Sequence, residues 1–137
     1  MQKAAFSIEK YVFNKVDIDL DNHISKDVSL NFETAGTYLS ENSEYELTFS
    51  VTTFNEEKTI DKPFLYVQCK GLFKFQNVSN FEEIPDYFYR NCIAILFPYL
   101  RAYISVVTTQ ANVPGIILPT LNLSSLEAEL RKNTNQK

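Results

Sequence analysis

Along the first three quarters of the chain, apolar and polar residues alternate with the two-residue period of a strand that buries one face. The alternation is clearest in residues 28–33, VSLNFE, and 45–52, YELTFSVT. Polar stretches at 21–27, 40–43 and 55–57 supply turns between the strands. The pattern predicts antiparallel strands with one face packed and the other in water.

The first predicted strand changes phase along its length. Its apolar residues stand at an even position at Phe6, at odd positions at Tyr11 and Phe13, and at even positions again from Val16. An extra residue in a strand shifts the faces in this way. We therefore expect a bulge or a bend near Asn14.

The fourth predicted strand, at about residues 64–75, is apolar along one whole face and begins with apolar residues on the other. The chain's own helices easily reach one face of a four-stranded sheet, so apolar residues on a second face indicate contact with another subunit. On this reasoning we assign Leu65, Val67 and Cys69 to an interface between copies of the chain.

From Pro85, a natural first-turn residue, to about Gln110, apolar residues recur at spacings of three and four, which predicts a long helix. Two neighbouring stripes of this helix are apolar. A helix that rests on its own sheet needs one such stripe, so the surplus predicts packing against the same helix of a symmetry mate. The interface residues assigned on this helix are Ile93, Leu100 and Ile104.

The segment 111–123 is apolar although Pro114, Gly115 and Pro119 forbid a regular strand or helix there. Connecting loops are ordinarily polar because they lie in water. Two explanations stay open: the loop packs on the sheet as a lid over the core, or its apolar side chains line a groove that receives a ligand.

Ser124 and Glu127 have the spacing of a capping box, and Leu126 and Leu130 follow one helical turn apart. They predict a short final helix that must dock on the rest of the fold. Residues 131–137 are polar, and we expect them to be frayed. The predicted fold is α+β, with a four-stranded antiparallel sheet, a long C-terminal helix, a hydrophobic loop and a short final helix in one domain of residues 1–137.

Composition and charge narrow the classes of function. The chain has 137 residues, 45% of them hydrophobic, and can build a core without a metal or disulfide. A net charge of −4 without a basic cluster argues against nucleic-acid binding. The longest apolar run, residues 92–100, falls well short of the ~18 residues of a membrane span. We expect a soluble, cytoplasmic protein without membrane insertion.

Candidate chemistry is sparse. Three glycines cannot build the usual phosphate-binding loops. The single histidine, His23, lies in a polar stretch typical of an exposed turn, away from any activated nucleophile. Cys69 and Cys92 are too far apart for a CxxC site and are typical of reduced core thiols. We predict no catalytic residue, no metal site, no cofactor and no enzymatic activity.

The functional signal is an excess of apolar and aromatic side chains, with 11 Phe and 8 Tyr. Together with the doubly apolar helix and the apolar loop, it indicates a surface that binds extended apolar polypeptide, to which strand edges can add backbone hydrogen bonds.

Two stretches are similar to signatures of a known family. ILFPYLRAYIS, from Ile95, and LPTLNLSSLEAEL, from Leu118, resemble a helix segment and a following loop of the bacterial protein-export chaperone SecB. Weaker similarity extends from FSIEKYVF at Phe6, through GLF at Gly71, to Leu130. A Phe-Pro-Tyr inside a long helix, followed at this distance by Pro-x-Leu-Asn-Leu, is a fairly specific combination.

The resemblance implies a four-stranded sheet with a long helix, and dimers that pair into a tetramer through the long helices. It also implies an ATP-independent holdase that binds unfolded, export-competent polypeptides in grooves formed by the sheet, the long helix and the loop after it. The matching client-binding candidates in this sequence are Phe32, Phe97, Leu118, Leu121, Leu123, Leu126 and Leu130.

The resemblance also bears on partners. Exporting members of the family use acidic residues on the first and fourth strands, and a C-terminal tail, to reach the motor ATPase SecA. Asp17 and Asp19 are the matching partner-docking candidates, whereas Tyr66 stands at the fourth-strand position and residues 131–137 are basic. These departures leave room for another duty, the protection of the antitoxin of a toxin–antitoxin pair. Alternatives of other classes are a hotdog-type thioesterase and a scaffold that binds one folded partner.

Overall fold

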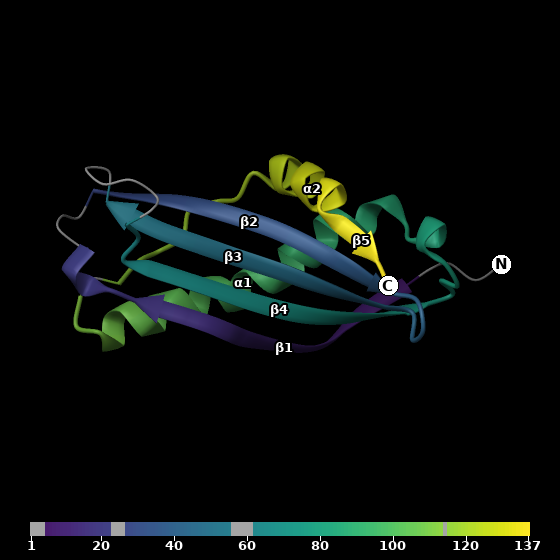
Figure 1. Cartoon of the computed structure of the whole chain (residues 1–137), viewed down its shortest axis with the longest axis horizontal. Coiled ribbons are helices and arrows are strands. Elements are labelled where there is room, and N and C mark those ends of the chain that lie inside the picture. The colour runs from purple at the N-terminus through teal and green to yellow at the C-terminus, as the bar shows by residue number, and fades with distance from the viewer. Residues whose placement is uncertain (1–4, 23–26, 56–61, 114) are drawn as a thin grey trace.

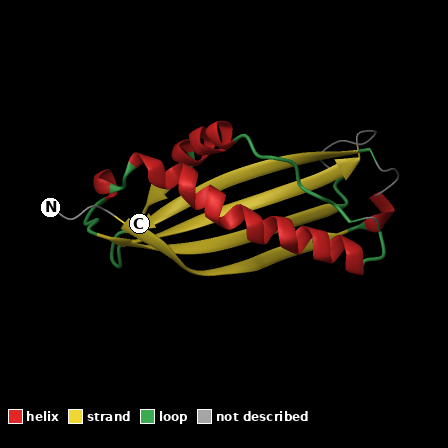
Figure 2. Ribbon diagram, turned by 180° about the vertical axis from the view of Figure 1, so that it is seen from behind, coloured by secondary structure: helices red, strands yellow, loops and turns green. Residues whose placement is uncertain are grey.

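The computed structural model describes residues 5–22, 27–55, 62–113 and 115–137, so His23 lies outside the described residues. One sheet carries a long helix across one face, and a short helix lies beside its upper edge (Figures 1 and 2). The elements are β1 (Ala5–Ile18), the 3-10 turn η1 (Leu20–Asn22), β2 (Val28–Leu39), β3 (Glu44–Asn55), β4 (Leu65–Gln76), the 3-10 turn η2 (Phe81–Glu83), α1 (Asp86–Gln110), α2 (Leu123–Lys132) and β5 (Thr134–Gln136).

The strands lie in the order β1-β4-β3-β2-β5, antiparallel except for β5, which is parallel to β2. The α+β prediction, the long helix and the short final helix are confirmed, but the described sheet has five strands instead of four. The difference lies in the tail that we expected to be frayed. There the N–H of Gly36 donates to the Asn133 carbonyl at 3.2 Å and the N–H of Lys137 donates to the Tyr38 carbonyl at 2.9 Å, which adds β5 to the edge of β2.

The phase change in β1 is confirmed and consists of two register shifts against β4, one between Ile8 and Lys10 and one between Phe13 and Lys15. The second lies at Asn14, where the sequence predicts it. Each shift returns the apolar side chains to the side of the sheet that α1 covers. Ile8 and Phe13 accordingly pack against the core.

The core lies between the sheet and α1. The helix approaches β4 closely at Gly71, where an added Cβ would lie 3.2 Å from the Leu96 side chain. Near the start of α1, Phe88 is fully buried, and its ring centroid lies 4.8 Å from those of Phe75 and Tyr45. Close-packed aromatic rings thus fix the helix along the sheet.

The six residues assigned to an interface between subunits require a correction. On β4, Leu65, Val67 and Cys69 face α1. On α1, the assigned residues Ile93, Leu100 and Ile104 face the sheet. All six therefore lie in the core of one chain, at 0–1% exposure. Periodicity identifies two apolar stripes on the helix but does not say which one meets the chain's own sheet. The large apolar side chains left outside, at 39–58% exposure, include Tyr11, Val16, Tyr99 and Val106.

Candidate functional site

The connection from α1 to α2, residues 111–122, runs back along the helix-covered side of the sheet (Figure 2). Neighbouring residues of this loop point in different directions: Leu118 is 2% exposed, whereas Ile117 is 72% exposed. Part of the loop therefore covers the core, as the first explanation predicts, while other apolar side chains of the loop remain accessible, and their binding of a ligand stays a prediction.

Three adjoining hollows follow the loop, and together we name them the loop groove. The first, of about 310 Å³, lies between α1 and the loop, and the second, of about 390 Å³, lies beside it around Phe97 and Ile117. The third, of about 230 Å³, lies between β2, the loop and α2. The first two share Phe97 and Arg101, and the first and third share Thr120 and Leu121, so the three hollows adjoin one another.

Six of the seven client-binding candidates line the loop groove, namely Phe32, Phe97, Leu118, Leu121, Leu123 and Leu126. Leu118 and Leu126 are nearly covered and form its floor. The seventh, Leu130, is fully buried in the core. Its selection is corrected, because the spacing of Leu126 and Leu130 shows that they share a helix face but not how deeply each is buried.

Aromatic rings from three elements support the groove. Phe32 on β2, Phe49 on β3 and Phe97 on α1 lie with ring centroids 6.2–6.4 Å apart. Phe49 is fully buried and anchors the other two, which are partly exposed. The groove therefore has an aromatic base and a lining that is apolar for the most part, an arrangement suited to apolar side chains.

Sequence reasoning missed several lining residues. Ala94, Pro98 and Ala102 form the α1 wall, and Leu30 lies at the β2 end. The sequence signal for this wall was the spacing of these three small residues, one helical turn apart on α1, because small side chains leave space for a groove beside a helix. Arg101 also lines two of the hollows and places a cation beside apolar surface.

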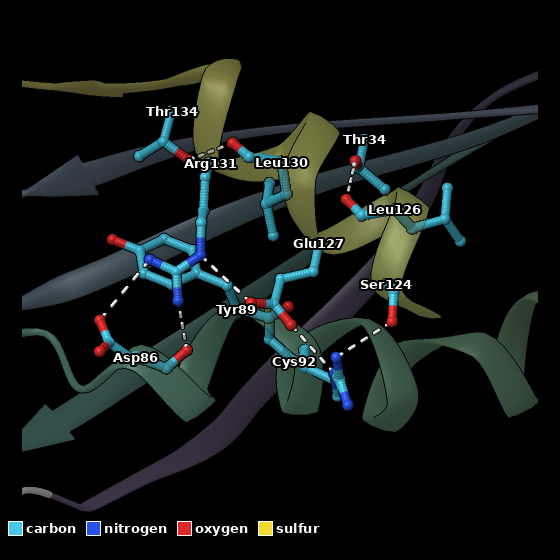
Figure 3. A network of polar contacts seen from close by, with 11 residues as sticks. Thr34, Asp86, Tyr89, Cys92, Ser124, Leu126, Glu127, Leu130, Arg131 and Thr134 are labelled. Atoms are coloured by element: carbon cyan, nitrogen blue, oxygen red, sulfur yellow. Dashed lines mark hydrogen bonds and ion pairs between the residues drawn. The ribbon is translucent and has the colours of Figure 1, made fainter. Parts of the chain in front are cut away.

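A polar network fixes α2 beside α1 (Figure 3). Arg131 donates to the Asp86 carbonyl at 2.8 Å and to Glu127 at 3.2 Å, and its guanidinium lies 4.4 Å from the Tyr89 ring centroid. Arg90 donates to Glu127 at 3.0 Å and to the Ser124 hydroxyl at 3.2 Å. Desolvation raises the pKa of Glu127, but the hydrogen bonds and charges of the two arginines outweigh it and lower the pKa below its ordinary value.

A second apolar surface, which we name the β1 flank, lies where β1 meets α1. Tyr11 stacks on Tyr99 with centroids 4.2 Å apart, and Phe13 stacks on Tyr103 at 4.0 Å. Among the described strands, β1 pairs only with β4, so its other edge carries unpaired backbone groups.

The two partner-docking candidates differ in environment. Asp17 is exposed and stands opposite Tyr66 across the β1–β4 ladder. The Asp19 carboxylate instead accepts from the Asp21 N–H at 3.1 Å and from the Asn22 amide at 3.3 Å. Asp19 therefore stabilises the η1 turn, and Asp17 is the more available of the two.

The two cysteines are buried thiols, and the part of the chain that the structure describes holds no cluster of metal-ligating side chains. Burial raises the pKa of Cys69 to about 11 and raises that of Cys92 further, so neither thiol is an activated nucleophile. No group of three or more His, Cys, Asp or Glu among the described residues could hold a metal ion.

The length and composition of α1 also meet the criteria for a membrane-spanning helix, with a mean hydropathy of 1.5. The core helix of a soluble protein meets the same criteria. Here 33% of that apolar window is buried inside the fold, and eight side chains of α1 are buried. Packing against the sheet accounts for that buried third, whereas Tyr99 and Val106 of α1 lie outside the core at 39% and 58% exposure.

Residues 6–133 match the family model described as preprotein translocase subunit SecB, and the chain belongs to this family. The uncharacterized protein MJ0357 of Methanocaldococcus jannaschii is 30% identical, over 95% of this chain and 87% of that protein. The protein-export protein SecB of Thiobacillus denitrificans is 26% identical, over 99% of this chain and 93% of the relative.

A solved structure has the same fold. It is that of the SecB-like chaperone Rv1957 of Mycobacterium tuberculosis, in complex with a ChAD peptide from the HigA1 antitoxin. The TM-score is 0.65 at 18% identity, and the match covers 85% of this chain and 90% of the other. The resemblance seen in the two sequence stretches therefore extends over most of the chain.

Proposed function

We propose that this protein is an ATP-independent holdase that binds non-native polypeptides in the loop groove and keeps them competent for export from the cytoplasm. The observation that carries the proposal is the row of adjoining, largely apolar hollows beside three packed aromatic rings in a chain of the SecB family. Each client side chain that it buries contributes on the order of 1–2 kcal/mol. On this proposal the protein is not an enzyme and needs no cofactor.

A matched pair of variants tests the groove. Ile117 in the groove and Val12 on β1 are both exposed apolar residues, at 72% and 55%, and Val12 does not line the groove. We expect Ile117→Asp to weaken suppression of the aggregation of reduced insulin, without ATP, and Val12→Asp to leave it unchanged. Equal activity of both variants, or no suppression by the wild type, contradicts the proposal.

The duty in the cell is part of the same proposal. Family membership supports protein export, and Asp17 is the residue proposed to reach a SecA-type motor. The related fold of Rv1957, solved with an antitoxin peptide, supports the alternative of guarding an antitoxin. Co-purification with SecA that Asp17→Asn abolishes supports export, and capture of an antitoxin encoded beside this protein supports the alternative.

We also propose that the chain assembles as a dimer of dimers and that the β1 flank is one of its interfaces. Its stacked tyrosines and free strand edge remain accessible in one chain, whereas the six residues first assigned to this role are buried. Light scattering should give a mass well above 15.8 kDa, and Tyr99→Asp should lower it. A monomeric wild type contradicts the assembly but leaves the groove proposal standing.

A further inference from the structure

After α1 the chain turns back, and two of its backbone N–H groups beyond the helix donate to the same residue, Thr108. Asn112 adopts a left-handed conformation, with φ of 64°, directly after the helix C-cap. The Val113 N–H then donates to the Thr108 carbonyl at 3.3 Å. Farther along, the Ile116 N–H donates to the hydroxyl of the same Thr108 at 3.0 Å.

The Thr108 hydroxyl is held in one orientation. It donates to the Ile104 carbonyl at 2.8 Å, with the Ser105 carbonyl at 3.2 Å. Because its hydrogen points back along the helix, a lone pair of its oxygen faces the loop. Thr108 is only 3% exposed, so water does not readily compete for the Ile116 N–H.

The rest of the loop has few other attachments. Within the described part of the chain, no other hydrogen bond joins residues 115–121 to the fold. The apolar attachments are Leu118, which is buried in the core, and Ile116 and Leu121, which pack against the core and are partly buried. Ile117, Leu118 and Leu121 line the groove in this same stretch. Ile116 directly precedes this wall, so its hydrogen bond to Thr108 lies where it can position the wall.

Resting on the proposed function, we propose that Thr108 is the positioning residue that sets the loop wall of the groove and thereby its affinity for apolar peptide. Thr108 does not line the groove and acts through the Ile116 N–H. Thr109 provides a matched control, because its hydroxyl donates to the Ser105 carbonyl at 2.8 Å in the same way but accepts no loop N–H.

The experiment measures two quantities on the full chain. Anisotropy of a fluorescein-labelled, unstructured peptide rich in Phe and Leu reports affinity, and amide hydrogen exchange reports the Ile116 N–H. Thr108→Val should weaken binding about five- to tenfold and speed exchange at Ile116, as expected for the loss of one buried hydrogen bond. Thr108→Ser should restore both, and Thr109→Val should match the wild type.

Two outcomes overturn the inference. One is unchanged exchange at Ile116 in Thr108→Val, and the other is faster exchange with wild-type peptide affinity. If Thr108→Val loses global stability, Thr108→Ser still decides, because a rescue of both quantities requires the hydroxyl and not merely the side-chain volume. A wild type that binds no peptide refutes the proposed function itself, whereas the exchange measurement still decides whether Thr108 anchors the loop.

Discussion

Two neighbouring loop residues should respond very differently to the same truncation. Leu118 is 2% exposed and packs in the core, whereas Ile117 is 72% exposed. Truncating a buried Leu to Ala costs about 2–5 kcal/mol, and a loop can partly close the cavity, so we expect about 2–3 kcal/mol for Leu118→Ala. Ile117→Ala should stay within about 0.5 kcal/mol of the wild type, because an exposed side chain gains little from folding.

Thermal and urea unfolding at one fixed protein concentration measure the difference. For a domain of this size, about 2–3 kcal/mol corresponds to a fall in Tm of roughly 10 °C. Concentration is held constant because assembly contributes to the apparent stability. Equal unfolding midpoints for Leu118→Ala and Ile117→Ala would refute the claim that Leu118 covers the core while Ile117 lies in the wall of the groove.

Three further predictions concern the tail, a thiol and a carboxylate. Gly36→Ala should weaken the pairing of β5 with β2, because an added Cβ would overlap the Tyr45 hydroxyl, which forms a hydrogen bond with the Thr134 hydroxyl. We expect faster hydrogen exchange of the Lys137 amide in this variant. Unchanged exchange would contradict this account. Cys69, with its pKa near 11, should resist alkylation at pH 8 until the protein unfolds, so rapid labelling of folded protein would disprove its burial. Because the pKa of Glu127 is lowered in the folded state, the unfolded state binds more protons, so the stability that Glu127 contributes is present above about pH 4.5 and is lost as the pH falls below it. The free energy of unfolding of Glu127→Gln should therefore depend less on pH in this acid range. An equal dependence on pH in the variant and the wild type would count against the arginine contacts.

The elements of the fold were open to prediction because their signals are local. The alternation of residues 28–33 depends only on the two-residue period of a strand. The bulge at Asn14 was predictable for the same reason, because an inserted residue changes the phase of that period in the sequence itself. The capping-box spacing of Ser124 and Glu127 indicated α2, although the cap that the structure uses is the side chain of Asn122.

The strand β5 was not predictable from the tail. Residues 134–136 are polar and carry no strand pattern, and they become a strand only because the edge of β2 offers backbone partners at Gly36 and Tyr38. Backbone N–H and C=O groups at a strand edge can pair with a segment of any compatible sequence, so the pairing segment need not show a strand pattern of its own.

The sequence by itself determined the composition of the groove, since most of its lining residues stand in the apolar loop and on one side of the long helix. The tertiary structure alone decided depth: it placed Leu130 and the six supposed interface residues in the core, and left Ile117, Tyr11 and Tyr99 accessible. Periodicity states which residues share a face, but burial depends on what distant segments bring against that face. For that reason the apolar side chains could be identified from the sequence, while their division between the core, the loop groove and the β1 flank required the tertiary structure.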